Sequence, residues 1–346
     1  MKRAITTICV SLAALSAQAQ EFVNDSQIIQ SLETEMAAII SAGKAPPVAD
    51  LMKGLARRKG AFRVDAPFNL VTEPENLYSQ VKKATLVMAS YSLCGNCSKH
   101  HASPASGFLI SSDGLAVTNY HVMEKSDATA FAAMTSDGKL HKVIEVVAAN
   151  KVADVAVVRL EGDGFDYLPV ARSATPGEDV FVLSHPNRAF YYMTRGVVAR
   201  YARAGRKPIL EITADYAAGS SGGPVVNSRG QVVGVVSATS SVYYHTAREG
   251  QSRGDLQMVR KFCVPSGEIL NLRSNGGYFS FPFHFGMGGV RGGIKLNLSN
   301  RIPPLNLPLW PYGGRGFFLP LIQPSRRSQF CTCLHAVSPG VGRGAK

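Results

Sequence analysis

The stretch PVVNSRGQVVGVV, residues 224–236, places two valine-rich runs on either side of Ser228-Arg229-Gly230. Valine favours strands, and a short polar turn ending in glycine between two apolar runs is typical of a β-hairpin. The same alternation extends from about Thr85 to Ser241, with further turn signals at residues 112–114 and 136–138. Because no long helical pattern interrupts it, the region predicts an antiparallel sandwich or a pair of barrels.

Ten short runs in this region are expected to be strands. They cover residues 85–88, 107–110, 115–118, 142–147, 155–160, 180–183, 195–200, 209–212, 224–226 and 231–236. The stretch from Leu256 to Leu272 predicts a last strand followed by a short helix.

Upstream of the β-rich region the apolar spacing is helical. Apolar residues recur three and four positions apart over residues 28–40, after a cap expected at Asp25 or Ser26 and before a helix end expected at Pro46-Pro47. Residues 77–81 predict a second short amphipathic helix.

The first 19 residues have the pattern of an export signal. Lys2 and Arg3 precede an apolar run over residues 4–17, and Ala17-Gln18-Ala19 places small residues where signal peptidase requires them. An uncleaved anchor fits less well, because the run is short for a membrane span. We therefore expect cleavage after Ala19 and an exported bacterial protein, periplasmic or secreted, without stable membrane insertion.

The charge and composition exclude several classes of protein. The chain has 346 residues, 45% of them hydrophobic, which excludes collagen, a coiled coil and a wholly disordered chain. The net charge is +13, but residues 273–346 hold nine basic and no acidic residues, while the first 272 carry 28 basic and 24 acidic ones. With the charge concentrated there, we expect no nucleic-acid partner.

Residues 273–346 differ in composition from the rest of the chain. They contain 13 Gly and 8 Pro, a content associated with low complexity. A disordered cationic tail and an out-of-frame translation of the gene's end both fit, and neither predicts a chemical role for this segment.

Three motifs in the β-rich region carry the chemistry. They are Thr118-Asn-Tyr-His121-Val, Ala153-Asp154-Val-Ala-Val and Gly219-Ser-Ser221-Gly-Gly-Pro224. A serine hydroxyl is a weak nucleophile that needs an imidazole base, and a carboxylate on the other ring nitrogen holds that imidazole in one tautomer. Glycines beside the serine let backbone N–H groups converge on a developing oxyanion. Together the motifs predict a nucleophilic site, although each alone has a purely structural explanation.

These motifs, with Ser106-Gly-Phe-Leu-Ile110 before them, resemble the trypsin-like serine peptidases, and most closely the bacterial HtrA/Deg branch. The resemblance covers residues 77–272. It implies His121 as general base, Asp154 as its orienting carboxylate and Ser221 as nucleophile. It also implies an oxyanion hole made by the backbone N–H groups of Gly219 and Ser221. Ser237, Ala238 and Thr239 match the segment that pairs with extended substrate.

Three features depart from the Deg pattern. Ser220 stands where Asn usually precedes the nucleophile. Nothing after Leu272 has the pattern of a PDZ domain, so a PDZ-regulated role is not expected. Asp215 lies six residues before Ser221, where trypsins have the acid that selects basic residues; we interpret it as structural and do not expect strict Lys/Arg specificity.

The cysteines allow more than one interpretation. Cys94-Gly-Asn-Cys97, followed by His100 and His101, is half of a zinc knuckle, and Cys263 could add a third thiolate. In an exported protein a disulfide is the commoner outcome. We favour a Cys94–Cys97 disulfide with Cys263 left as a buried thiol, and we expect no metal and no cofactor; a bond from either cysteine to Cys263 is the third alternative.

The expected fold is therefore all-β, with two packed six-stranded antiparallel barrels of the chymotrypsin type. The expected organisation is a signal peptide (1–19), a helical extension (20–76), a peptidase domain (77–272) and the tail (273–346). The expected function is a serine endopeptidase that acts on protein or peptide substrates through an acyl-enzyme. The alternative is a protease-fold binding protein that has lost activity, against which the three intact catalytic side chains argue.

Overall fold

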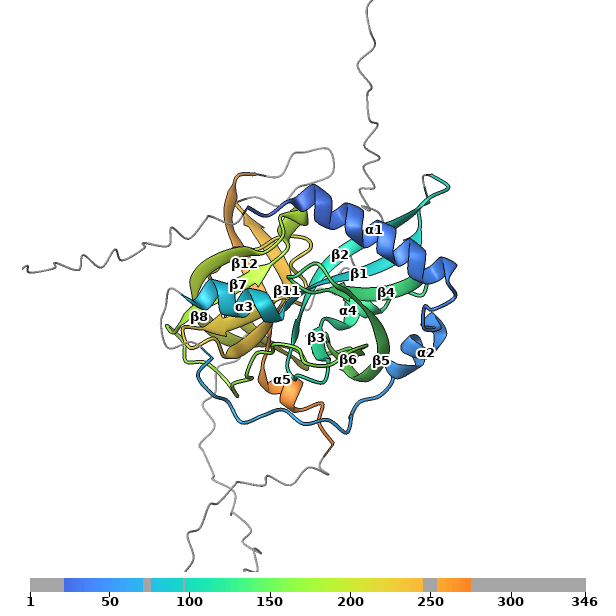
Figure 1. Ribbon diagram of the computed structural model, residues 1–346. Helices are drawn as coiled ribbons and strands as arrows, with labels where there is room; N and C mark the ends of the chain where they lie inside the picture. The colour runs from blue at the N-terminus through green and yellow to red at the C-terminus, as the bar shows by residue number, and fades with distance from the viewer. Residues whose placement is uncertain (1–21, 71–75, 96, 245–253, 275–346) are drawn as a thin grey trace, which may run out of the picture. The chain divides into compact units, whose positions relative to one another are not determined.

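The strands form two antiparallel barrels, as predicted (Figure 1). The computed structural model describes residues 22–70, 76–95, 97–244 and 254–274. The expected export signal (1–19) and all of the expected tail after Ser274 lie outside these residues. Among the described helices, none is long and apolar enough to cross a membrane.

The first barrel closes in the order β1-β2-β3-β6-β5-β4, with β4 paired back onto β1. Its strands are β1 (Thr85–Leu93), β2 (His100–Leu109), β3 (Leu115–Thr118), β4 (Ala128–Met134), β5 (Leu140–Asn150) and β6 (Val155–Leu160).

The second barrel closes in the order β10-β11-β12-β9-β8-β7, with β10 paired onto β7. Its strands are β7 (Asp179–Ser184), β8 (Tyr192–Ala204), β9 (Lys207–Ile212), β10 (Pro224–Asn227), β11 (Val232–Tyr243) and β12 (Leu256–Pro265). The hairpin expected over residues 224–236 is the β10–β11 pair, in which Val225 faces Gly234.

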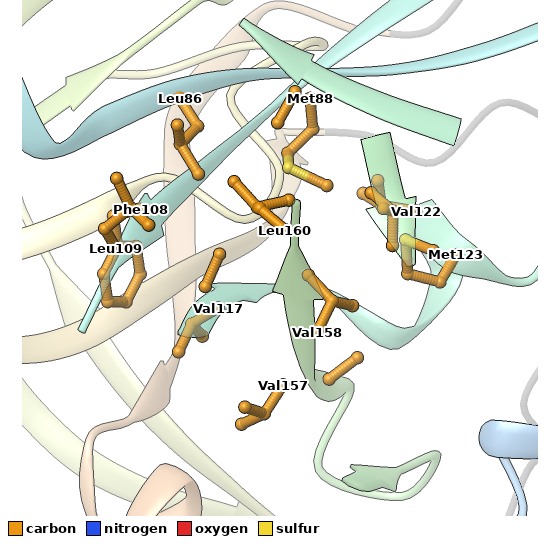
Figure 2. Close-up of a cluster of buried hydrophobic side chains, with 14 of the residues drawn as sticks. Leu86, Met88, Phe108, Leu109, Val117, Val122, Met123, Val157, Val158 and Leu160 are labelled. Carbon is orange, nitrogen blue, oxygen red and sulfur yellow. The ribbon is translucent and has the colours of Figure 1, made fainter. Parts of the chain in front are cut away.

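A cluster of interlocking apolar side chains fills the first barrel (Figure 2). Leu86, Phe108 and Val117 are 0% exposed and come from β1, β2 and β3. Alternate positions of these strands point inward, and β6 is buried along most of its length. This rigid core supports the ends of β3 and β6, where two of the three chemical motifs lie.

Short helices lie around the barrels. They are α1 (Asp25–Ser41), α2 (Val48–Gly54), α3 (Leu77–Ala84), α4 (Tyr120–Met123), α5 (Gly267–Leu270) and the 3₁₀ turn Pro186–Arg188. In Figure 1 α1 lies along β1, β2 and β4, and its Leu32 and Met36 are buried in the same core as the first barrel. The helical extension is thus part of the packing of that barrel.

The first helix differs from its prediction at both ends. Its N-cap is Asn24, whose Oδ1 accepts from the backbone N–H of Gln27 at 3.1 Å, in place of the expected Asp25 or Ser26. The helix ends at Ser41, several residues before Pro46-Pro47. Pro47 instead precedes α2, a position that proline tolerates because its missing N–H has no helical partner there.

Candidate active site

His121 and Asp154 are brought together by the pairing of β3 with β6. His121 lies on α4, which follows β3, and Asp154 immediately precedes β6; Thr118 and Ala156 are paired across the two strands. His121 Nδ1 lies 2.9 Å from Asp154 Oδ1 and 3.0 Å from Oδ2, and the His121 backbone N–H donates to Oδ1 at 3.2 Å. The carboxylate therefore orients the imidazole and leaves its Nε2 free to face a nucleophile.

The backbone of Asp154 is held in a conformation that aspartate seldom adopts. Its φ is +66°, in the left-handed region, which costs a non-glycine residue about 1–2 kcal/mol. Its N–H donates to the carbonyl of Asn150 at 2.9 Å, and its own carbonyl accepts from Asn119 Nδ2 at 2.8 Å. These bonds fix the turn that aims the carboxylate at His121.

The environment keeps Asp154 ionised. Burial alone would raise the pKa of this carboxyl, whose side chain is only 13% exposed, but hydrogen bonds from His121 and Ser237 outweigh burial and hold the pKa below its usual value. An ionised carboxylate at this point can stabilise an imidazolium on His121.

Ser221 lies in the loop that enters β10 of the second barrel. Its carbonyl accepts from the backbone N–H of Ser106 on β2, which ties this loop to the first barrel. Its Oγ donates to the carbonyl of Ser237 at 3.4 Å, a long and weak hydrogen bond. Within the described residues no hydrogen bond joins Ser221 Oγ to His121.

The loop before Ser221 has the geometry of an anion-binding turn. Gly219 has φ +93°, and a Cβ there would approach the carbonyl oxygen of His185 to 2.4 Å, so only glycine fits. In the part of the chain that the structure describes, the backbone N–H groups of Gly219 and Ser221 donate to no protein acceptor, whereas that of Ser220 bonds to Ala217. Two unbonded donors separated by one residue can hold an oxyanion.

Two serines take positions that the sequence analysis missed. Ser237 Oγ donates to Asp154 Oδ2 at 2.6 Å, in addition to the expected place of Ser237 on the substrate-pairing strand β11. Ser106 Oγ donates to the carbonyl of Gly219 at 3.0 Å and accepts from the His185 N–H at 3.2 Å. Because both contacts cross between the barrels, spacing along the sequence contains no signal for them.

Asp215 is paired with a lysine from the neighbouring strand β12. Lys261 Nζ donates to Asp215 Oδ1 at 2.6 Å, and the Lys261 side chain is 8% exposed while that of Asp215 is 83% exposed. A carboxylate already neutralised by a lysine is poorly suited to select a basic substrate residue, which fits its structural interpretation.

The three cysteines in the described part of the chain occupy two separate regions. Cys94 and Cys97 lie in the connection between β1 and β2, beside His101. Cys263 lies on β12 in the core of the second barrel, where burial raises the pKa of its thiol to about 12. The expectation of a buried Cys263 is confirmed; the Cys94–Cys97 disulfide remains a prediction.

Comparison with known proteins finds similarity to serine peptidases. Residues 105–235 match the model of the trypsin-like peptidase domain. The chain is 27% identical over 168 residues to the serine endoprotease DegS of Haemophilus influenzae, covering 46% of this chain and 46% of DegS. It is 30% identical over 143 residues to the putative serine protease HhoB of Synechocystis sp., covering 38% of this chain and 34% of HhoB.

A third relative is a probable periplasmic DegP-like serine endoprotease of Marinomonas sp., 29% identical over 177 residues. That alignment covers 49% of this chain and 35% of the relative. A solved structure of an HtrA-type protease with a tripeptide overlays with a TM-score of 0.46 at 18% identity, covering 57% of this chain and 62% of that one. The chain thus spans less than half the length of each of these curated relatives.

Proposed function

Because this chain carries a trypsin-like peptidase domain related to those of the HtrA and Deg serine proteases, we propose that it is an exported serine endopeptidase whose nucleophile is Ser221. The observation that carries the proposal is the pairing of His121 with Asp154 at 2.9 Å, with Ser237 in contact with both Asp154 and Ser221. A fixed imidazole next to a serine on a glycine-rich turn is the arrangement that acyl transfer requires.

The reaction divides into two steps. In the first, Ser221 Oγ attacks the scissile carbonyl while His121 Nε2 takes the hydroxyl proton, and His121 then delivers that proton to the leaving amine as the C–N bond breaks. In the second, water attacks the acyl-enzyme, gives its proton to His121, and Ser221 leaves as the hydroxyl. Asp154 keeps its charge throughout and stabilises the imidazolium in both steps.

The backbone around Ser221 supplies the rest of the chemistry. The N–H groups of Gly219 and Ser221 would bind the oxyanion of each tetrahedral intermediate, and removing one such donor typically costs about 100- to 1000-fold in kcat. Ser237, Ala238 and Thr239 on β11 would pair with the extended substrate backbone, which holds the scissile bond over Ser221.

The substrates proposed are proteins or peptides without a strict requirement for Lys or Arg. The ion pair between Asp215 and Lys261 supports this, since such a pair offers little net negative charge to a substrate cation. Replacing Asp215 by Asn should change the ratio of cleavage after Lys and after Ala by less than about fivefold, because Lys261 already neutralises this carboxylate.

Export through residues 1–19 is part of the proposal. It is supported by the sequence pattern of that segment and by the periplasmic description of the DegP-like relative. N-terminal sequencing of the protein from a periplasmic fraction should begin at Gln20. A mature protein that begins at Met1, or that stays in the cytoplasmic fraction, would refute export.

Hydrolysis of an unfolded protein and of a fluorogenic peptide library tests the activity. Ser221→Ala and His121→Ala should each lower kcat by about 10⁴- to 10⁶-fold, with little further loss in the double variant, as residues that act together behave. Ser228→Ala, in the exposed turn before β11, is the matched control and should retain full activity. A wild-type protein that binds peptides as tightly as Ser221→Ala and cleaves none of them would favour the inactive binding protein instead.

A further inference from the structure

Side chains of the types that bind metals gather at the end of the β1–β2 hairpin. Cys94, Cys97 and His101 each present one ligand atom, and these three atoms all lie within 4.8 Å of one another. Two thiolates and an imidazole are the donors that Zn²⁺ prefers in proteins. None of these residues has a role in the proposed catalysis.

Strand pairing fixes the position of the histidine relative to the thiols. Ser92 on β1 is paired with His101 on β2, and Leu93 is paired with His100. The backbone N–H of Cys94 donates to the carbonyl of Lys99 at 2.8 Å, which extends the pairing into the connection. His101 therefore approaches the cysteines from a paired strand. The register of that pairing sets the distance between His101 and the two thiols.

The separations suit a tetrahedral metal ion. Cys97 Sγ lies 3.2 Å from His101 Nε2, and Cys94 Sγ lies within 4.8 Å of both atoms. In a tetrahedral zinc site with ordinary bond lengths, sulfur and nitrogen ligands are about 3.6 Å apart and two sulfurs about 3.8 Å apart. Small side-chain rotations would bring all three ligands to these distances.

A carboxylate from α1 orients the histidine. Glu33 Oε1 lies 3.2 Å from His101 Nδ1, while Nε2 of the same ring faces Cys97. Histidines that bind metals commonly use their second nitrogen in this way, and the carboxylate fixes the tautomer that leaves the other nitrogen as a ligand. A Cys94–Cys97 disulfide would give neither His101 nor Glu33 a role.

We propose that Cys94, Cys97 and His101 bind a zinc-class divalent cation, with Glu33 as the outer carboxylate that joins the site to α1. The metal would link the β1–β2 hairpin to the helical extension, because α1 contributes Glu33 and already packs against β2. Within the described residues the ring of His100 stacks on Tyr91, with centroids 5.4 Å apart. Among the described residues no fourth His, Cys, Asp or Glu joins the group, and we assign the fourth coordination position to water or a solvent anion.

Metal titration of the full chain tests the site directly. Cys9, Cys331 and Cys333 are replaced by Ser, so that Cys94, Cys97 and Cys263 are the only remaining thiols. The reduced, demetallated protein is titrated with Co²⁺ and then with Zn²⁺ under anaerobic conditions. We expect one equivalent of Co²⁺ with tetrahedral d–d and thiolate charge-transfer bands, displaced by one equivalent of Zn²⁺. Binding should weaken as the pH falls, because the thiols must lose their protons.

Variants separate this site from other modes of binding. Cys97→Ser should abolish the charge-transfer bands at one equivalent, and Glu33→Gln should weaken Zn²⁺ binding by about 10- to 100-fold while keeping one equivalent. His100→Gln is the matched control and should bind as the parent does. The proposal is overturned if the reduced protein binds no Co²⁺, if Cys97→Ser binds unchanged, or if the purified protein holds a Cys94–Cys97 disulfide that reforms in the presence of Zn²⁺.

Discussion

The hydroxyl of Ser237 donates a 2.6 Å hydrogen bond to Asp154 Oδ2, and so joins β11 of the second barrel to the carboxylate of the first. The carbonyl of the same residue accepts from Ser221 Oγ at 3.4 Å. Ser237 therefore contacts both the proposed orienting carboxylate and the proposed nucleophile. Together with the contacts of Ser106, Ser237 thus links the relative placement of the two barrels to the geometry of the proposed site.

Replacing Ser237 by Ala should lower kcat by about tenfold without unfolding the protein. A hydrogen bond to a charged group is worth about 1.5–3 kcal/mol, and only part of it supports the imidazolium in the transition state. Loss of the bond should also raise the pKa of Asp154, because burial would then be opposed by His121 alone. Peptide kinetics against pH measure both effects. Ser237→Thr, which keeps the hydroxyl, should restore activity, and an unchanged kcat in Ser237→Ala would contradict the role given to this bond.

Gly222→Ala should destabilise the protein strongly, by more than about 3 kcal/mol. Its φ is +88°, and an added Cβ would lie 2.2 Å from the carbonyl oxygen of Ser106 and 2.3 Å from Thr118 Oγ1. Both neighbours belong to the first barrel, so the clash would force the Ser221 loop away from it.

Gly138→Ala is the matched control, since Gly138 has φ +86° with nothing within 4 Å of the added Cβ. The free energy of unfolding of Gly138→Ala should fall by only about 1–2 kcal/mol, the cost of placing a non-glycine residue in the left-handed region. Urea unfolding of both variants measures the difference. Equal losses at the two positions would mean that the approach of Ser106 to the loop is not what requires glycine.

Stability should fall as the pH is lowered from about 6.5 to about 4, because His185 is buried in its neutral form. Its Nδ1 accepts from the Tyr191 N–H at 3.0 Å, its Nε2 lies 3.1 Å from the carbonyl of Leu86, and burial lowers its pKa to about 4. Between these pH values the unfolded chain takes up a proton that the folded chain does not, so acid favours unfolding. The expected loss is about 1.4 kcal/mol per pH unit and on the order of 3 kcal/mol in total.

Urea unfolding at several pH values measures this loss, and His185→Gln should remove that part of the slope. Glutamine can accept from one backbone group and donate to another, so the variant keeps hydrogen-bonding capacity at the site. If the slope between pH 6.5 and 4 is the same in His185→Gln and the parent, His185 does not cause it.

Much of the fold followed from local sequence. The β10–β11 hairpin was predicted because two valine-rich runs lie on either side of a glycine-containing turn, and β3 because its short apolar run follows the turn at residues 112–114. The strand β4 was not predicted, because its sequence ATAFAAM is rich in alanine, which has low β-propensity. It forms a strand because β1 and β5 on either side leave its backbone groups no other partner, a constraint that only the closed barrel supplies.

The candidate site, like the fold, could be predicted from the sequence only in part. The motifs of His121, Asp154 and Ser221 could be recognised because their residue types together suit nucleophilic catalysis, and the family resemblance then implied a role for each. The contacts of Ser237 with Asp154 and of Glu33 with His101 join residues 83 and 68 positions apart. Such contacts depend on how the barrels and the helical extension pack, which periodicity within one segment does not encode.

A chain that ends at Ser274 should fold and melt like the full chain. The Gly60 N–H donates to the carbonyl of Leu272, and the Ser274 N–H donates to the carbonyl of Gly60, both at 2.8 Å, so the paired backbone extends two residues past the boundary expected at Leu272. A shorter chain ending at Leu270 would lose this pairing and the buried side chain of Leu272. Thermal melts of the full chain and of the chains that end at Ser274 and at Leu270 compare their Tm values. A Ser274-terminated protein with a lower Tm than the full chain would show that later residues support the fold.

Labelling with a fluorophosphonate tests whether Ser221 is an activated nucleophile, because the probe reacts with an activated serine and needs no known substrate. The folded wild-type protein should take up one equivalent, and peptide mapping should locate it on Ser221. Ser221→Ala should take up none, and His121→Ala should react far more slowly. A folded wild-type protein that stays unlabelled, or that carries the adduct on a residue other than Ser221, would contradict the assignment of Ser221 as the nucleophile.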